Sequence, residues 1–114
     1  MVYDTAASVF SRFEDAKFRR DDGGSEDVDR CMRCDLLILD DLGTEMTTSF
    51  VQSALYQIVN GRLMAGRSTI ISTNLAPEEI GSRYGRSVLS RLEGEYEILP
   101  FFGEDIRRLK RERQ

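Results

Sequence analysis

Two adjacent aspartates follow an apolar run, and carboxylates in this position could bind a metal ion and activate a water. The run is LLIL, residues 36–39, and Asp40 and Asp41 follow it directly; we call this pair the acidic doublet. Mg²⁺ prefers oxygen ligands and keeps several waters, so one carboxylate could bind the metal while the other polarises a water. That division suits phosphoryl transfer, in which a metal neutralises charge and another group positions the nucleophile. The alternative is that both residues simply start a polar turn.

A second polar group ends the next strand-like run. Asn74 closes TIISTN, residues 69–74. A neutral amide there can hold a water or a phosphate oxygen without neutralising a carboxylate, although it could also be an ordinary turn residue before Pro77. Because doubly wound sheets bind ligands beyond the carboxyl ends of their strands, two runs that both end in such groups favour a functional site. A receiver domain is excluded, since no aspartate lies between Asp41 and Asp105.

Alternating strand-like and helix-like segments must position these groups. Thr5 is a plausible N-cap for the first helix, and Gly66 is a natural stop for the longest one. The run at 36–39 is continuously apolar, which is typical of a parallel strand covered on both faces. We expect an α/β domain with a mainly parallel sheet: strands at 2–3, 35–41, 67–74 and 96–101, helices at 4–18, 47–66, 76–85, 86–94 and 103–114, and a surface loop at 19–30.

The composition of the chain excludes several classes of protein. The chain has 114 residues, 40% of them hydrophobic and 32% charged, with a net charge of -4. No apolar run approaches the roughly 20 residues that cross a bilayer, so we expect a cytoplasmic protein without a membrane partner. Cys31 and Cys34 form C-x-x-C, but a zinc site needs further ligands and the sequence has no histidine. We interpret both as incidental, reduced thiols.

Three segments together carry a family resemblance: LLILDDLGTE, ALYQIVNGRLMAGRSTIISTNLAPEEI and SVLSRLEGEYEILPFFGEDIR. They resemble the AAA+ ATPases that load replicative helicases, the DnaC/DnaI-like family, which is close kin of the IstB-like transposition helper ATPases. The likeness extends from about Val2 to Arg108. It implies a P-loop NTPase fold, a three-layer sandwich with a mainly parallel sheet, and the use of ATP and Mg²⁺.

The resemblance also implies roles by position. Asp40, in the Walker B strand, would act on Mg²⁺, and Asp41 would be the acid that orients water. Asn74 matches the sensor 1 residue that faces nucleotide. Arg91 matches the arginine finger that reaches a neighbouring subunit, and Arg107 matches the sensor 2 arginine near the phosphates. A planar guanidinium suits charge on phosphoryl oxygens.

Each arginine has an alternative. Arg91 could pair on the surface with Glu93 or Glu95, and Arg107 lies in a basic tail. Arg83 and Arg86 are weaker candidates for contacts with nucleotide or DNA.

The phosphate-binding half of the family's site is missing from this sequence. The family binds ATP through a glycine-rich loop ending in G-K-[ST], but the two lysines, Lys17 and Lys110, do not follow a glycine. The resemblance therefore implies that residues 1–114 form one incomplete AAA+ domain, from the Walker B strand to the sensor 2 region, without the first (Walker A) strand and helix. We expect the chain alone to bind ATP weakly or not at all and not to hydrolyse it.

The missing strand would be central, between the strands at 69–73 and 96–99. Its absence would leave unpaired edges that favour rearrangement, dimerisation or marginal stability.

Three functions stay open at this stage. The first is part of a helicase loader, whose implied partners are the replicative helicase, single-stranded DNA and further AAA+ subunits. The second is an IstB-like transposition helper, which shares every motif quoted above. The third is a non-catalytic interaction module that lost ATP binding but kept Arg91 for the active site of a partner.

Overall fold

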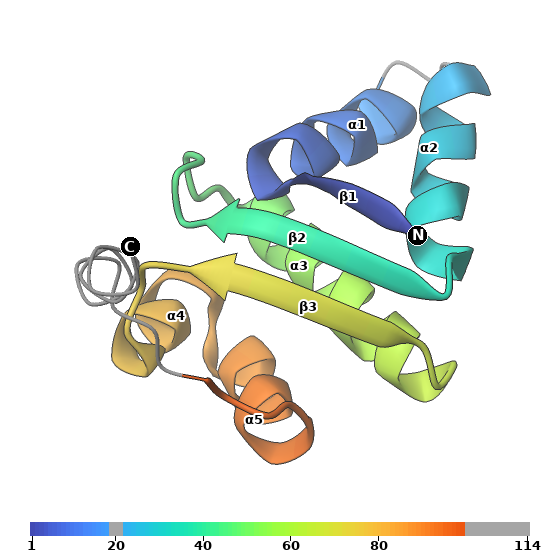
Figure 1. Cartoon of the computed structure of the whole chain (residues 1–114). Coiled ribbons are helices and arrows are strands. Elements are labelled where there is room, and N and C mark those ends of the chain that lie inside the picture. Colours follow the sequence, from blue (N-terminus) through green and yellow to red (C-terminus); the bar gives the residue numbers. More distant parts are fainter. Residues whose placement is uncertain (19–21, 100–114) are drawn as a thin grey trace, which may run out of the picture.

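Three parallel strands and five helices make up the part of the chain that the computed structural model describes, residues 1–18 and 22–99. The strands run in the same direction in the order β1-β2-β3, with α3 behind them (Figure 1). This confirms the expected α/β class and parallel sheet. In chain order the elements are β1 Val2–Thr5, α1 Ala6–Phe18, α2 Asp22–Arg33, β2 Leu36–Leu42, α3 Ser49–Met64, β3 Ser68–Thr73, α4 Pro77–Tyr84 and α5 Arg86–Glu95.

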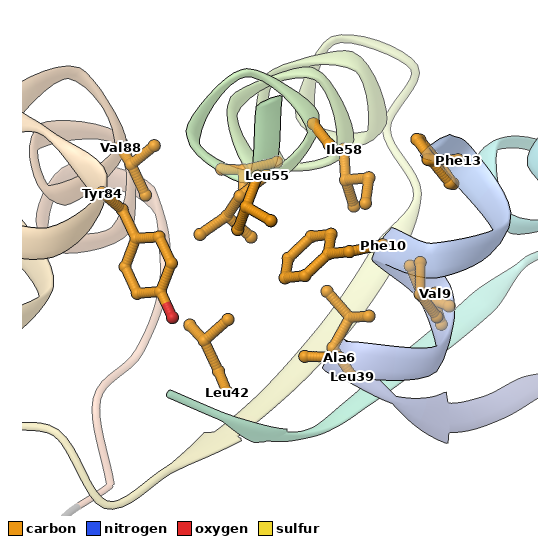
Figure 2. Close-up of a cluster of buried hydrophobic side chains, with 14 of the residues drawn as sticks. Ala6, Val9, Phe10, Phe13, Leu39, Leu42, Leu55, Ile58, Tyr84 and Val88 are labelled. Atoms are coloured by element: carbon orange, nitrogen blue, oxygen red, sulfur yellow. The ribbon is translucent and has the colours of Figure 1, made fainter. Parts of the chain in front are cut away.

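Helices α1 and α3 cover one face of the sheet, and the hydrophobic core lies between them and the strands (Figure 2). Leu37 and Leu39 of β2 point into it and are fully buried. The opposite face is bare among the described residues, with Tyr3 61% exposed and Ile70 52% exposed. The expectation that the strand is covered on both faces is therefore wrong, because no described helix lies over the second face.

Side-chain caps fix where the helices begin. The Oγ1 of Thr5 accepts a hydrogen bond from the backbone N of Ser8 at 3.2 Å, which confirms the expected N-cap of α1. The Oγ1 of Thr48 does the same for α3 by accepting from the backbone N of Val51 at 3.2 Å. Helix α3 ends as expected just before Gly66, which has a φ of 71°. These caps set the register of the two helices that pack on the sheet.

Helix α2 replaces the loop that we expected at 19–30; the structure describes residue 22 onward. Its apolar residues Val28, Cys31 and Met32 follow helical spacing and pack against the core. Ion pairs within the helix support it, such as the 3.2 Å contact between Arg30 and Asp27. The acidic residues and glycines that favoured a loop did not prevent a helix, because its apolar residues from Val28 onward pack against the core.

A buried arginine ties α2, α3 and β3 together. Arg62 of α3 is fully buried, and its guanidinium donates to the carbonyl oxygens of Cys31 and Ser68, both at 2.7 Å, and to the Oγ1 of Thr69 at 2.8 Å. It also lies 3.5 Å from the Sγ of Cys34. Within the described residues it forms no ion pair with a carboxylate, so hydrogen bonds to oxygen must compensate for the loss of water around its charge.

Both cysteines are free thiols. Cys31 is buried, and burial is the main reason that the pKa of its thiol is raised. A raised pKa lowers the thiolate fraction, which agrees with the interpretation of an incidental rather than a redox-active pair.

The strand expected at 96–101 does not form in its described part. Residues 96–99 are irregular, and Ile98 and Leu99 are exposed. A strand needs a neighbour for its backbone donors and acceptors, and no described strand pairs with this segment. The rest of that segment and the tail helix expected at 103–114 lie outside the described residues. No helix at 1–18 or 22–99 has the length and apolar character needed to cross a membrane.

Candidate functional site

The acidic doublet lies in a bulge of β2. The strand pairs regularly with β3 as far as Leu39 opposite Ile71, and the next pair is Leu42 opposite Thr73. Between these pairs β2 contributes one more residue than β3, which is the definition of a β-bulge. Asp41 has a φ of 61° there, the only positive φ of a non-glycine residue in the described part of the chain.

The bulge decides where each side chain points. Alternation along β2 puts Leu37 and Leu39 in the core, so a regular strand would also bury Asp41. With the extra residue, Asp41 is exposed and Leu42 takes the buried position, only 2% exposed. Two like charges can therefore follow a buried strand because neither of them enters the core.

Two hydroxyl groups hold Asp40 on the bare face of the sheet. Its carboxylate accepts hydrogen bonds from the Oη of Tyr3 at 3.1 Å and from the Oγ of Ser72 at 2.5 Å. The same Ser72 Oγ accepts the backbone N–H of Asp41 at 2.9 Å. The hydrogen bond to Asp40, followed by its charge, raises the pKa of Tyr3. One strand on each side thus orients Asp40, a role for Tyr3 and Ser72 that the sequence analysis missed.

This arrangement fits a magnesium ion held by few protein ligands. Each oxygen of Asp40 accepts one hydroxyl group, which leaves further lone pairs toward solvent. Among the described residues no three acidic, cysteine or histidine side chains converge as a metal cluster. Mg²⁺ commonly binds through one or two carboxylates, and waters or substrate phosphates complete its octahedron. The donor set is therefore suitable for Mg²⁺ and unsuitable for a closed structural metal site.

Asn74 follows the end of β3, next to the strand that carries the doublet. The strand ends are held together because the Oγ1 of Thr73 donates to the carbonyl oxygen of Leu42 at 2.6 Å. Asn74 itself is exposed, and its amide makes no hydrogen bond within the described part of the chain. The sequence thus placed an amide and two carboxylates at one edge of the sheet, although no hydrogen bond within the described residues joins Asn74 to the doublet.

The loop after the doublet is attached to α4. The guanidinium of Arg83 donates to the carbonyl oxygens of Gly43, at 2.9 Å, and Glu45, at 3.0 Å, and to the Oγ1 of Thr47. We considered Arg83 a weak candidate for nucleotide or DNA, but its side chain is used here within the protein. No signal in the sequence pairs it with this loop, because the contact joins residues about forty positions apart.

The structure describes one of the two arginines that we expected near phosphate. Arg91 is exposed on α5, and the structure pairs it with neither Glu93 nor Glu95. Helix α5 packs on α3 and α4. Arg107 lies outside the described residues. The interpretation of Arg91 as a group that acts on a neighbouring subunit stays a prediction.

A parallel sheet with crossover helices defines the class, an α/β fold, and the acidic doublet lies at the end of its strand β2. More particularly, the fold is that of the DnaC helicase loader, whose crystal structure matches with a TM-score of 0.76 over 86% of this chain, at 23% sequence identity. The chain spans 59% of the length of that DnaC chain. No protein-family model and no curated protein matches the sequence.

Proposed function

We propose that this chain is the part of a helicase-loader AAA+ ATPase that carries the Walker B, sensor 1 and arginine-finger elements and the sensor 2 region. The observation that carries the proposal is the doublet: Asp40 is oriented by two hydroxyl groups, and Asp41 is turned outward beside it. The DnaC-like fold supports the same assignment. The cofactors are ATP and Mg²⁺, and the protein acts in the cytoplasm.

The two carboxylates have different tasks. Asp40 holds Mg²⁺, with Tyr3 and Ser72 fixing its orientation. The metal supplies neutralisation of phosphate charge. Asp41 is exposed, so its carboxylate can accept a hydrogen bond from a water and orient that water as the nucleophile. Asn74, at the adjacent strand end, holds a water or a phosphate oxygen.

The remaining groups act at longer range. Arg91 reaches the nucleotide of a neighbouring subunit, which fits its exposed position on α5, and Arg107 binds phosphate. The residues of this chain do not cradle the phosphates, because the sequence contains no G-K-[ST]. Hydrolysis therefore requires a P-loop in addition to these residues. The partners are the replicative helicase, single-stranded DNA and further AAA+ subunits.

Adding a P-loop tests the catalytic assignment. The chain is mixed with a P-loop-bearing fragment of a DnaC-type protein, and phosphate release from ATP is measured. We expect hydrolysis by the mixture, and a loss of about 100-fold or more in Asp41→Asn, since orienting and proton-accepting groups contribute on that scale. Asp35→Asn is the matched control, because Asp35 is an exposed aspartate at the opposite end of β2. Equal rates in the Asp41→Asn and Asp35→Asn variants would contradict the assignment.

The arginine finger has its own test in the same mixture. Arg91→Ala should lower hydrolysis strongly, as should Asp41→Asn. When the two variants are combined, a site with an intact Asp41 can receive Arg91 from its neighbour, so activity should return. If the combination stays inactive while each variant still assembles, Arg91 does not act across subunits.

The missing G-K-[ST] favours one second candidate, a non-catalytic interaction module. Such a module would assemble with an intact AAA+ ATPase and supply Arg91 to it. It would leave hydrolysis unchanged in Asp41→Asn but reduce it in Arg91→Ala, which separates it from the first proposal.

A further inference from the structure

Arg83 holds the loop that connects the acidic doublet to α3. Its guanidinium donates at 2.9 Å to the carbonyl oxygen of Gly43 and at 3.0 Å to that of Glu45. Two of its nitrogens also donate to the Oγ1 of Thr47, at 2.8 and 3.0 Å. One side chain from α4 thus binds three alternate residues of the loop. The planar guanidinium spreads five donors over three nitrogens, whereas an ammonium group directs its three donors from a single nitrogen.

A buried carboxylate attaches the same loop to α4 a second time. The side chain of Glu45 is 6% exposed, and it accepts the Oη of Tyr84 at 2.5 Å and the backbone N–H of Gly43 at 3.0 Å. Burial and then this hydrogen bond raise the pKa of Tyr84, so its phenol stays a donor. The guanidinium of Arg83 lies 3.8 Å from the carboxylate of Glu45 and balances its charge.

The attached loop, residues 43–47, begins two residues after the strained residue of the bulge. Asp41 has a φ of 61° and Gly43 a φ of 112°, and the Oγ1 of Thr44 donates to the carbonyl oxygen of Asp41 at 3.1 Å. A non-glycine residue stays in this region of φ only where its surroundings impose it. The contacts of Arg83 start two residues further along, so they oppose relaxation of the loop toward ordinary backbone.

We propose that Arg83 is a positioning residue: by binding the loop at 43–47 it holds Asp41 in the outward, left-handed conformation that water activation requires. This rests on the proposed function for its catalytic consequence, but the conformational part is independent of it. Helix α4 continues through Gly85 into α5, which carries Arg91. The loop at 43–47 and Arg91 are therefore both attached to the connected helices α4 and α5.

Nuclear magnetic resonance tests the conformational part. A positive φ brings the amide and α protons of one residue close, so Asp41 should give a strong intraresidue Overhauser effect in the wild type. In Arg83→Met this signal should weaken, and amide exchange at 43–47 should accelerate roughly tenfold. Arg83→Lys should not restore either property. Arg67→Met is the control, because Arg67 also donates to a backbone carbonyl, that of Arg33, but outside this loop.

The ATPase mixture described above tests the catalytic part. Arg83→Met should lower kcat by about 10- to 100-fold with an unchanged KM, since a small misplacement of a catalytic group costs that much. An unchanged Overhauser effect at Asp41, or an unchanged kcat despite a loosened loop, would overturn the proposal. If the wild-type mixture fails to hydrolyse ATP, the proposed function fails, while the resonance experiment still decides whether Arg83 positions Asp41. Should Arg83→Met lose protection in α1, the milder Arg83→Lys variant provides both measurements.

Discussion

Replacing Asp41 separates the stability of the fold from its chemistry. Asp41 is exposed and has a φ of 61°, a conformation that costs a non-glycine residue about 1–2 kcal/mol. Asp41→Gly removes this cost, while the extra freedom of glycine in the unfolded chain offsets roughly 0.5–1 kcal/mol. We therefore expect Asp41→Gly to be more stable by about 0.5–1 kcal/mol. Asp41→Val places a β-branched residue in the same region and should lose about 1–3 kcal/mol.

Urea unfolding at neutral pH, followed by circular dichroism, measures both changes. With a slope of roughly 1–1.5 kcal/mol per M, the midpoint should rise by about 0.5 M in the glycine variant and fall by about 1–2 M in the valine variant. Asp35 provides the control, because it is exposed and lacks a positive φ. Asp35→Gly should lower the midpoint and Asp35→Val should barely change it, the reverse of the pattern at residue 41.

The result that would refute the reasoning is a valine variant as stable as the wild type. It would mean that the bulge relaxes without cost, and the structural basis for an outward Asp41 would be lost. A stabilised Asp41→Gly variant should also be inactive in the ATPase mixture, because the water-orienting carboxylate is gone. Strain would then be kept at this position for activity rather than for stability.

Three further changes test other contacts of the structure. Arg62→Met should cost about 3 kcal/mol or more in urea unfolding, since buried carbonyl oxygens lose their donors, and Arg62→Lys should not recover it. Asp40→Asn should lower the pKa of Tyr3 toward the ordinary 10.0, measured by phenolate absorbance, because the hydrogen bond to the carboxylate and then its charge raise this pKa. The pKa of Tyr84 is raised in the folded state, so its contribution to stability is complete below pH 10.0, the ordinary value, and is lost above it as the unfolded phenol ionises first. Tyr84→Phe should therefore show a shallower fall in unfolding free energy between neutral pH and strongly alkaline pH.

Features that depend on local chemistry could be predicted from the sequence. Thr5 has a hydroxyl group ahead of a helical pattern, and it caps α1. The apolar run at 36–39 formed β2, and the β-branched run at 68–73 formed β3. The parallel pairing of these two strands then places Asn74 and the acidic doublet at one edge of the sheet. The cap and the two strands follow from local sequence, and only the pairing of β2 with β3 joins distant segments.

Features that depend on distant contacts could not be predicted in this way. The polar composition of residues 19–30 predicts a loop, whereas α2 is stabilised by packing Cys31 against the core. The bare face of the sheet was missed because an apolar run shows that a strand can be covered, not that a helix is present to cover it. The attachment by Arg83 joins two segments that share no local pattern.

The bulge lies between these two cases, because its cost is local but the continuously apolar run at 36–39 does not show which of its residues point inward. Leu37 and Leu39 set an inward period of two, which assigns the next inward position to Asp41. Leu42 is apolar one position too late, so a regular strand would bury a carboxylate and expose a leucine. One extra residue removes both costs, at the expense of a strained φ at Asp41. The same distortion gives two identical side chains different environments. Asp40 keeps the regular strand orientation and accepts hydrogen bonds from hydroxyl groups on the neighbouring strands. Asp41 is exposed to water.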